Sequence, residues 1–236
     1  MSGWAKKRFW KETAYEASDG GFKVLLDGRG VKTPAKASLV VPTKAMAKAV
    51  VAEWDAQEGE IDPTGMPVTR SVNAAIDKVA VQHAEVADML AEYGGSDLLC
   101  YRATTPEELI ARQAEAWDPL LDWAAETFDA RLKPVAGVMF EAQDADALSK
   151  LSAKTHDFDN FELAAFHDLV GISGSLIIGF AATRDLHPIE TLWNLSRIDE
   201  QWQEDQWGRD DEAAEEAEKK KQAFFHAYSF FNLSKS

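Results

Sequence analysis

The sequence holds one cysteine, Cys100, among 236 residues, and its basic side chains are far outnumbered by acidic ones. A lone cysteine excludes a disulfide within the chain and fits a reducing compartment. Lysine and arginine total 25 against 40 aspartate and glutamate residues, which gives a formal net charge of -15. This balance argues against nucleic acid and anionic membranes as partners, because both attract clustered positive charge.

Long hydrophobic runs are also missing. The most apolar window, Leu169–Ala182, has 14 residues, whereas a helix that spans a bilayer needs about 20. The stretch Met1–Trp10 carries Lys6, Lys7 and Arg8 without an apolar region after them, so it does not resemble a secretory signal. We therefore expect a cytoplasmic protein that is not inserted into a membrane.

The sequence lacks the motifs of nucleotide and metal sites. It contains no Walker pattern, no GxGxxG, no HExxH and no paired-cysteine motif. Cys100 lies in the apolar run Leu98–Tyr101, where a catalytic thiol paired with a remote histidine and an inert buried thiol are the two interpretations. One group of acidic and histidine residues matches no standard metal spacing and is better explained as polar residues at helix ends: His156, Asp157, Asp159, His167 and Asp168. We predict no metal, no cofactor and no catalytic residues.

The first part of the chain has the pattern of a small antiparallel sheet. Gly20-Gly21 and Asp27-Gly28 separate the apolar runs Phe9–Ala17, Phe22–Leu26 and Val31–Thr33. These dipeptides supply the positive φ angles that tight hairpins require, so the pattern predicts consecutive β-hairpins.

Helical patterns dominate the rest of the chain. Thr43 is the expected N-cap of a helix ending near Glu58, and from Val68 onward helices prevail. We predict an α+β fold, with a small antiparallel β-rich domain and one helix at residues 1–67 and a larger all-helical domain at residues 68–236. The helices predicted after residue 67 cover approximately residues 69–79, 83–93, 105–128 (with Thr105 as N-cap), 145–155, 160–183, 188–208 and 210–231.

Small residues recur along the most apolar of these helices. Gly171, Ser175 and Gly179 are spaced four residues apart and form a stripe that lets another helix approach closely. Tight core packing is one interpretation, and a groove for a partner's segment is the other.

Acidic residues concentrate near the C-terminus. Residues 185–218 contain 12 acidic and 2 basic side chains, so the 34-residue segment has a net charge of -10. On a continuous helix, one face carries Leu192, Leu195, Ile198 and Trp202, while the opposite face carries Trp193, Glu200, Glu204 and Trp207. Either the two tryptophans are exposed beside carboxylates as a binding patch, or the helix is packed on two sides and both are buried.

A set of short motifs occurs in the order typical of one protein family. The chain resembles the assembly chaperones of the α subunit of the F-type ATP synthase, and the likeness extends over nearly the whole chain. The matching stretches are Arg8–Lys11, Asp27–Arg29, Lys32–Ala35, Glu53–Gln57, Met66–Thr69, Asp97–Arg102, Arg112-Gln113, Trp117–Leu120, Ser196–Glu200 and Trp207-Gly208.

The resemblance implies a chaperone that binds the unassembled α subunit and prevents its aggregation, without nucleotide hydrolysis. It implies a bacterial member, because mitochondrial members carry a transit peptide, and we expect the free protein to be monomeric. A small hydrolase or transferase with a site in an interdomain cleft, and a structural subunit of a larger complex, are the alternatives. Combined with the helical phase, the resemblance marks as partner-binding residues Glu200, Trp193, Trp207, Glu204 and Asp199, and as structural or functional residues Trp54, Asp55 and Trp117.

Overall fold

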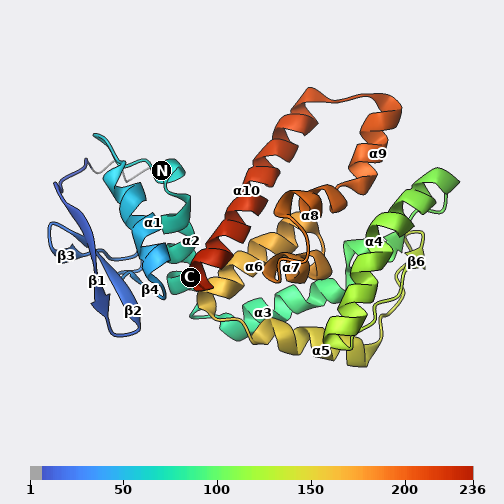
Figure 1. Ribbon diagram of the computed structural model, residues 1–236, viewed down its shortest axis with the longest axis horizontal. Helices are drawn as coiled ribbons and strands as arrows, with labels where there is room; N and C mark the ends of the chain where they lie inside the picture. The colour runs from blue at the N-terminus through green and yellow to red at the C-terminus, as the bar shows by residue number, and fades with distance from the viewer. Residues whose placement is uncertain (1–6, 236) are drawn as a thin grey trace. The chain divides into compact units, whose positions relative to one another are not determined.

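The N-terminal region forms a four-stranded antiparallel sheet in the computed structural model, which describes residues 7–235 (Figure 1). Strand β2 lies between β1 and its other neighbours, β3 and β4. Gly20 (φ 79°) and Gly28 (φ 73°) turn the chain between successive strands, with Asp27 also at positive φ (47°). The predicted hairpins are confirmed. The strands are β1 (Thr13–Ser18), β2 (Gly21–Leu26), β3 (Arg29–Gly30) and β4 (Val40–Val41).

Helix α1 (Lys44–Asp55) packs against β1 and β2. Its N-terminus is capped as predicted, because the Thr43 side chain accepts a hydrogen bond from the Met46 backbone N–H at 3.1 Å. The buried face of the helix, which includes Met46 and Val50, meets buried strand residues such as Val24. Helix α2 (Pro67–Ala74) follows and continues into a single π-helical turn at Ala75–Val79.

The remainder of the chain is almost entirely helical, and the predicted α+β class is confirmed. A short parallel pair, β5 (Tyr101–Arg102) with β6 (Val135–Ala136), interrupts the helices. The helices are α3 (His83–Ala91), α4 (Glu107–Phe128), α5 (Ala145–His156), α6 (Asn160–Ser173), α7 (Leu176–Thr183), α8 (Ile189–Leu195), α9 (Ile198–Trp207) and α10 (Asp211–Lys235).

Three helix predictions are wrong in detail. The helix predicted over 160–183 is divided, because Gly174 adopts φ 71° and Ser175 starts α7 as its N-cap. The helix predicted over 188–208 is likewise divided between α8 and α9. Helix α4 takes Pro106, not Thr105, as its N-cap residue, and Pro106 contributes no side-chain hydrogen bond.

Because the apolar segment forms two helices, the residues Gly171, Ser175 and Gly179 do not form a stripe along one helix. Gly171 is exposed near the end of α6, whereas Gly179 lies in α7 with no room for a side chain. A Cβ at Gly179 would approach Val170 to 2.6 Å and Phe166 to 2.9 Å. The absence of a side chain at Gly179 therefore permits tight packing of α7 against α6, which is one of the two interpretations of the stripe.

The chain divides into two compact units. The first takes the described residues up to His83 together with 160–165 and the described residues after 228, and the second takes 84–159 and 166–228, so α6 and α10 contribute to both. The boundary predicted at residue 67 stays a prediction, and the stretch 1–6 that was searched for a secretory signal lies outside the described residues. Within residues 7–235, no helix is both long and apolar enough to span a membrane.

Candidate functional site

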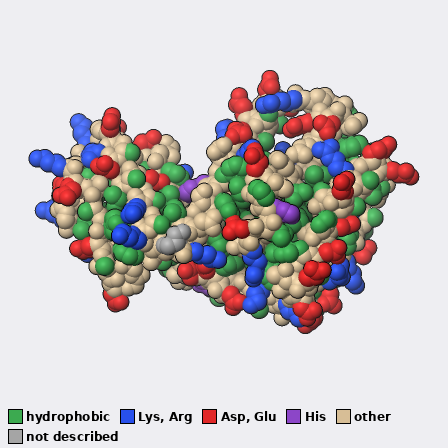
Figure 2. Space-filling view, viewed as in Figure 1, with side chains coloured by type: hydrophobic (Ala, Val, Ile, Leu, Met, Phe, Trp, Pro, Cys, Tyr) green, Lys and Arg blue, Asp and Glu red, His purple; other side chains and the backbone are tan. Residues whose placement is uncertain are grey.

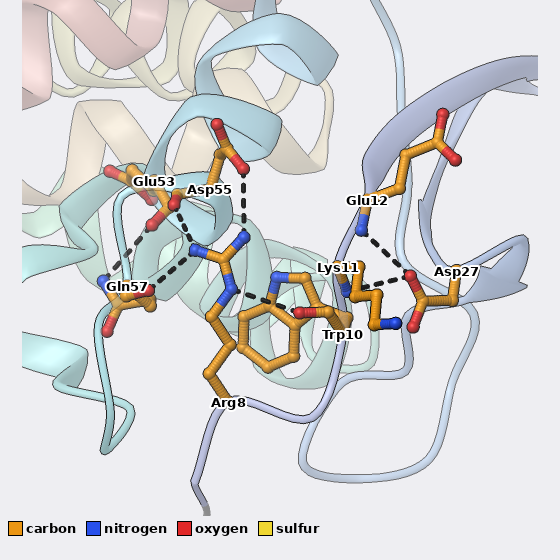
Figure 3. A network of polar contacts seen from close by, with 8 residues as sticks. All are labelled: Arg8, Trp10, Lys11, Glu12, Asp27, Glu53, Asp55 and Gln57. Carbon is orange, nitrogen blue, oxygen red and sulfur yellow. Dashed lines mark hydrogen bonds and ion pairs between the residues drawn. The ribbon is translucent and has the colours of Figure 1, made fainter.

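The N-terminal motifs meet in one polar network around Arg8 (Figure 3). Its guanidinium donates to the backbone oxygens of Trp10 (3.2 Å), Asp55 (2.6 Å) and Gln57 (2.8 Å). It also reaches the Asp55 carboxylate at 3.2 Å. A positive charge at the C-terminal end of α1 is favoured by the helix dipole. Arg8 therefore ties the segment before β1 to the end of α1, and this is where the structure places Asp55.

Two carboxylates of these motifs accept hydrogen bonds from backbone N–H groups of the same unit. Glu53 accepts hydrogen bonds from the backbone N–H groups of Val68 and Thr69, both at 2.7 Å, and so caps the start of α2. Asp27 accepts from the backbone N–H groups of Lys11 and Glu12, both at 2.9 Å, and these bonds lower the pKa of its carboxyl group. The N-terminal motifs thus hold the first unit together.

Trp54 belongs to the same region and is half-buried. Its ring lies 5.1 Å from that of buried Trp10, edge to face, and both indole N–H groups are buried without an acceptor among the described residues. The phase of α1 predicts that Trp54 packs against the body of the protein, and this ring contact agrees with that prediction.

We expect Trp54→Ala to lower the free energy of unfolding by about 2–3 kcal/mol, less than the roughly 3–5 kcal/mol typical of a fully buried tryptophan. Chemical denaturation measures this, with Trp54→Phe as a control that keeps an aromatic ring against Trp10. An unchanged unfolding curve together with lost partner binding would instead place Trp54 on an interface.

A polar seam joins α4 and α9 in the second unit. The Gln113 side chain accepts from the backbone N–H of Ala103 at 2.8 Å and donates to the Asp199 carboxylate at 2.6 Å. Arg112 donates to Asp205 at 2.8 Å and to Gln201 at 3.2 Å. The seam thereby brings together two motifs that lie far apart in the sequence.

Trp117 lies beneath this seam and is fully buried. Its indole N–H donates to the backbone oxygen of Leu195, the last residue of α8, at 2.8 Å. The guanidinium of Arg102 lies over its ring, 5.3 Å from the centroid, and is held by Asp118 and the Leu99 backbone oxygen, both at 2.7 Å. The structure thus places Trp117 in the core, at the junction of α4 and α8.

An open cavity of about 620 Å³ lies beside the seam. Its wall includes the Tyr101–Pro106 segment, Leu109 and Gln113 of α4, and the α9 side chains Asp199 and Trp202. Trp207 and Val138 also line it, and their exposed fractions are 80% and 93%. The next two residues, Met139 and Phe140, are 77% and 71% exposed.

The sequence interpretation missed the run Val138–Phe140. The signal was present, since three consecutive apolar residues occur between Gly137 and Glu141, in a segment without a helical pattern. Large exposed apolar side chains of this kind are typical of binding surfaces when they gather in one place.

The predicted partner-binding residues lie on α8 and α9 and do not share one surface. Asp199 and Trp207 line the 620 Å³ cavity, while Trp193 and Glu204 line a smaller one of about 220 Å³ that also includes residues of α10. Glu200 lines neither and pairs with Arg197 at 2.7 Å, with 44% of its side chain exposed.

Neither of the two interpretations of the acidic segment, both tryptophans exposed or both buried, holds for the pair, because Trp193 is buried and Trp207 is exposed. The exposed fraction of Trp193 is 6%, and its ring lies 5.9 Å from that of Phe224 on α10. The exposed fraction of Trp207 is 80%. The prediction assumed one continuous helix over 188–208, but α8 ends at Leu195 and α9 begins at Ile198. In addition, α10 packs against Trp193.

Acidic side chains gather around α9, the start of α10 and the start of α4 in the space-filling view (Figure 2). The first turn of α4 carries Glu107 and Glu108, and that of α10 carries Asp211 and Glu212. Glu107 and Glu108 directly follow Pro106 of the cavity wall, and their negative charge favours a partner that carries positive charge.

The cysteine and the histidines that the sequence analysis considered as catalytic or metal-binding residues are buried or bonded to neighbouring carboxylates. Burial raises the pKa of the Cys100 thiol to about 12, so it is protonated at neutral pH, as expected of an inert buried thiol. His156 bonds Asp88 at 2.8 Å, and His167 bonds Asp168 at 2.9 Å. Residues 7–235 contain no group of three or more side chains arranged to hold a metal ion.

Comparison with known proteins places the chain among chaperones. A family model described as ATP12 chaperone protein matches residues 7–125. Protein atp12, mitochondrial, of Schizosaccharomyces pombe is 29% identical over 229 residues, which cover 89% of this chain and 76% of the relative.

Solved structures agree over almost the full length. The crystal structure of Atp12 from Paracoccus denitrificans matches with a TM-score of 0.94 and 47% identity, covering 97% of this chain and 98% of that one. The Atu1473 protein of Agrobacterium tumefaciens matches with a TM-score of 0.90 and 38% identity, over 96% of this chain and 85% of that one. The chain therefore belongs to the ATP12 chaperone family, the family of ATP synthase assembly chaperones that its motifs resemble.

Proposed function

We propose that the protein is an ATP-independent chaperone that binds the unassembled α subunit of the F-type ATP synthase and prevents its aggregation. The observation that carries the proposal is the cavity mouth, where Trp207 and Val138 are exposed beside acidic side chains in a member of this family. A subunit destined for a ring exposes a large, partly apolar interface before assembly, and that surface self-associates when left free.

The proposed task is binding and release, so it requires no catalytic residue, nucleotide or metal. We propose that the protein works in the cytoplasm and is monomeric when free, since its net charge of -15 opposes self-association. The competing proposal, a small enzyme, predicts that a nucleotide or metal ion raises the melting temperature, because a ligand that binds only the native state stabilises it.

Co-expression with a tagged α subunit tests the function. We expect the chain to be retained on the α subunit when the other subunits of the synthase are absent, and to be released when the β subunit is added. Retention of other proteins but never of the α subunit would contradict the proposal, and so would a reproducible thermal shift with nucleotide in the absence of any client.

We propose that the acidic residues of α9 contribute to client binding, with Glu200, Glu204 and Asp199 facing basic groups of the client and Trp207 supplying apolar contact. Trp193 is buried and lines the smaller cavity together with Glu204, so we propose that it supports that part of α9. Asp199 is already bonded to Gln113, whereas Glu200 and Glu204 have exposed carboxylates.

The variant Glu200→Gln tests whether this carboxylate contributes to client binding or to the stability of the protein itself. Exposed ion pairs contribute about 0–1 kcal/mol, so loss of the pair with Arg197 is expected to change the unfolding free energy by no more than that. We expect weaker suppression of client aggregation at low salt, with a difference from wild type that shrinks at high salt. Wild-type activity at low salt, or a large loss of thermal stability, would refute the assignment.

A further inference from the structure

The exposed apolar run at the cavity mouth has no role within the described structure. Val138, Met139 and Phe140 follow β6, and each exposes more than two thirds of its side chain. Trp207 stands at the same mouth, at the end of α9. Scattered exposed apolar residues are normal, but a tryptophan gathered with three successive large apolar side chains is typical of an interaction site.

Two of the polar side chains in the cavity wall are already bonded within the protein. Gln113 is used by Ala103 and Asp199, and Arg102 is used by Asp118 and the backbone. The exposed surface of the cavity is mainly apolar and includes Leu109, Trp202 and Trp207, with neutral polar side chains of threonine and glutamine beside them. The volume of about 620 Å³ lies within the range, roughly 300–1,000 Å³, of cavities that enclose small ligands or a few side chains.

The margin of the cavity carries unpaired negative charge. Glu107 and Glu108 follow the lining residue Pro106, and Glu141 follows Phe140. These three glutamates are exposed, and within residues 7–235 none of them forms an ion pair. An occupant that carries lysine or arginine beside an apolar segment would complement both features.

We propose that this cavity and the run Val138–Phe140 form the client-docking site, which receives an apolar segment of the unassembled ATP synthase subunit flanked by lysine or arginine. The proposal rests on the proposed function and adds the surface and the chemistry of the segment bound. A second copy of this chain is a poor occupant, because two identical acidic margins would face each other in a molecule of net charge -15. An anionic membrane is disfavoured for the same reason.

The apolar contribution is tested with the variant Val138→Ser/Met139→Ser/Phe140→Ser in the full-length protein. Because these side chains are exposed, we expect an unchanged melting temperature and a dissociation constant for the purified α subunit that rises at least about tenfold. The matched control is Val81→Ser/Met89→Ser, which alters exposed apolar residues that do not line the cavity and should leave binding unchanged.

The charge contribution is tested with Glu107→Gln/Glu108→Gln. We expect weaker binding at low salt and a flatter dependence of affinity on salt concentration, because two charges that face the client have been removed. Glu212→Gln/Glu215→Gln on α10 makes the same change in net charge on exposed residues outside the cavity lining, and should have the smaller effect.

A photo-crosslinker at position 140 identifies the occupant directly. In the presence of the α subunit, we expect a crosslink to an apolar stretch of that subunit with lysine or arginine close by in its sequence. Wild-type protein that binds the α subunit while the serine variant binds equally well, or a crosslink chiefly to a second copy of the chain, would overturn the docking site and leave the proposed function standing. Wild-type protein that fails to bind the α subunit would overturn both.

Discussion

Trp117→Ala is expected to lower the free energy of unfolding by about 3–5 kcal/mol, as is typical when a fully buried tryptophan is truncated. The substitution opens a cavity between α4 and α8 and leaves the Leu195 backbone oxygen without its 2.8 Å donor. It also removes the ring beneath the guanidinium of Arg102. Unfolding by urea, followed by far-ultraviolet circular dichroism, measures the change.

Trp207→Ala is the matched control for that experiment. Trp207 is exposed, so its truncation should change the unfolding free energy by no more than about 0.5 kcal/mol. The loss of unfolding free energy for Trp117→Phe should lie between those of the two alanine variants, because a ring is kept while the N–H donor is lost. Equal effects of the two alanine substitutions would show that Trp117 is not the core residue that the structure describes.

Asp97 is expected to make stability depend strongly on pH. Its carboxylate is fully buried between two helix starts, where it accepts hydrogen bonds from the backbone N–H groups of Leu99 (3.0 Å) and Ile177 (3.1 Å). Burial outweighs these bonds and the one from Ser175, and raises the pKa of the carboxyl group from 3.8 to about 6.

The direction of the pH dependence follows from the number of protons that the folded and unfolded states bind. Between pH 4 and 6 the folded protein holds a proton on Asp97 that the unfolded chain has released, so the contribution of Asp97 to stability falls as pH rises through this window. The shift corresponds to a difference on the order of 3 kcal/mol. Unfolding measured from pH 4 to 7 for wild type and Asp97→Asn isolates it, because only the wild type titrates at this position. A free-energy difference between the two proteins that stays constant over that range would contradict the account.

Local signals were sufficient where the fold depends on neighbouring residues. The hairpins follow from Gly20 and Asp27-Gly28, and the start of α1 follows from the Thr43 side chain, which bonds three residues ahead. Each of these features is decided by backbone conformation or hydrogen bonds within a few residues, so the sequence pattern alone predicts it.

The helix breaks depend on partners that are distant in sequence. The start of α7 is held by Asp97, which lies 80 positions before Ile177. The Leu195 backbone oxygen would be bonded by Asp199 in a continuous helix, but it accepts from Trp117 instead, 78 positions away. Hydrophobic periodicity contains no information about such contacts, so both pairs of helices were predicted as single helices.

The candidate site was predicted in part. The acidic segment was identified from the sequence, because charge is read directly from composition, whereas the exposure of Trp207 was one of two open interpretations. The burial of Trp193 by α10 and the cavity formed by Tyr101–Pro106, α4 and α9 require tertiary contacts. The run Val138–Phe140 could have been noted from sequence, but its place at a cavity mouth could not.

Light scattering by the purified α subunit tests the central claim most directly. The subunit is diluted from denaturant alone, with an equimolar amount of this protein, or with an equimolar amount of the Val138→Ser/Met139→Ser/Phe140→Ser variant, all without nucleotide. The account predicts that the wild-type protein suppresses scattering and forms a complex with the α subunit that can be isolated by size-exclusion chromatography, whereas the variant suppresses it poorly. Scattering that is the same with and without the wild-type protein, and no isolable complex, would contradict it.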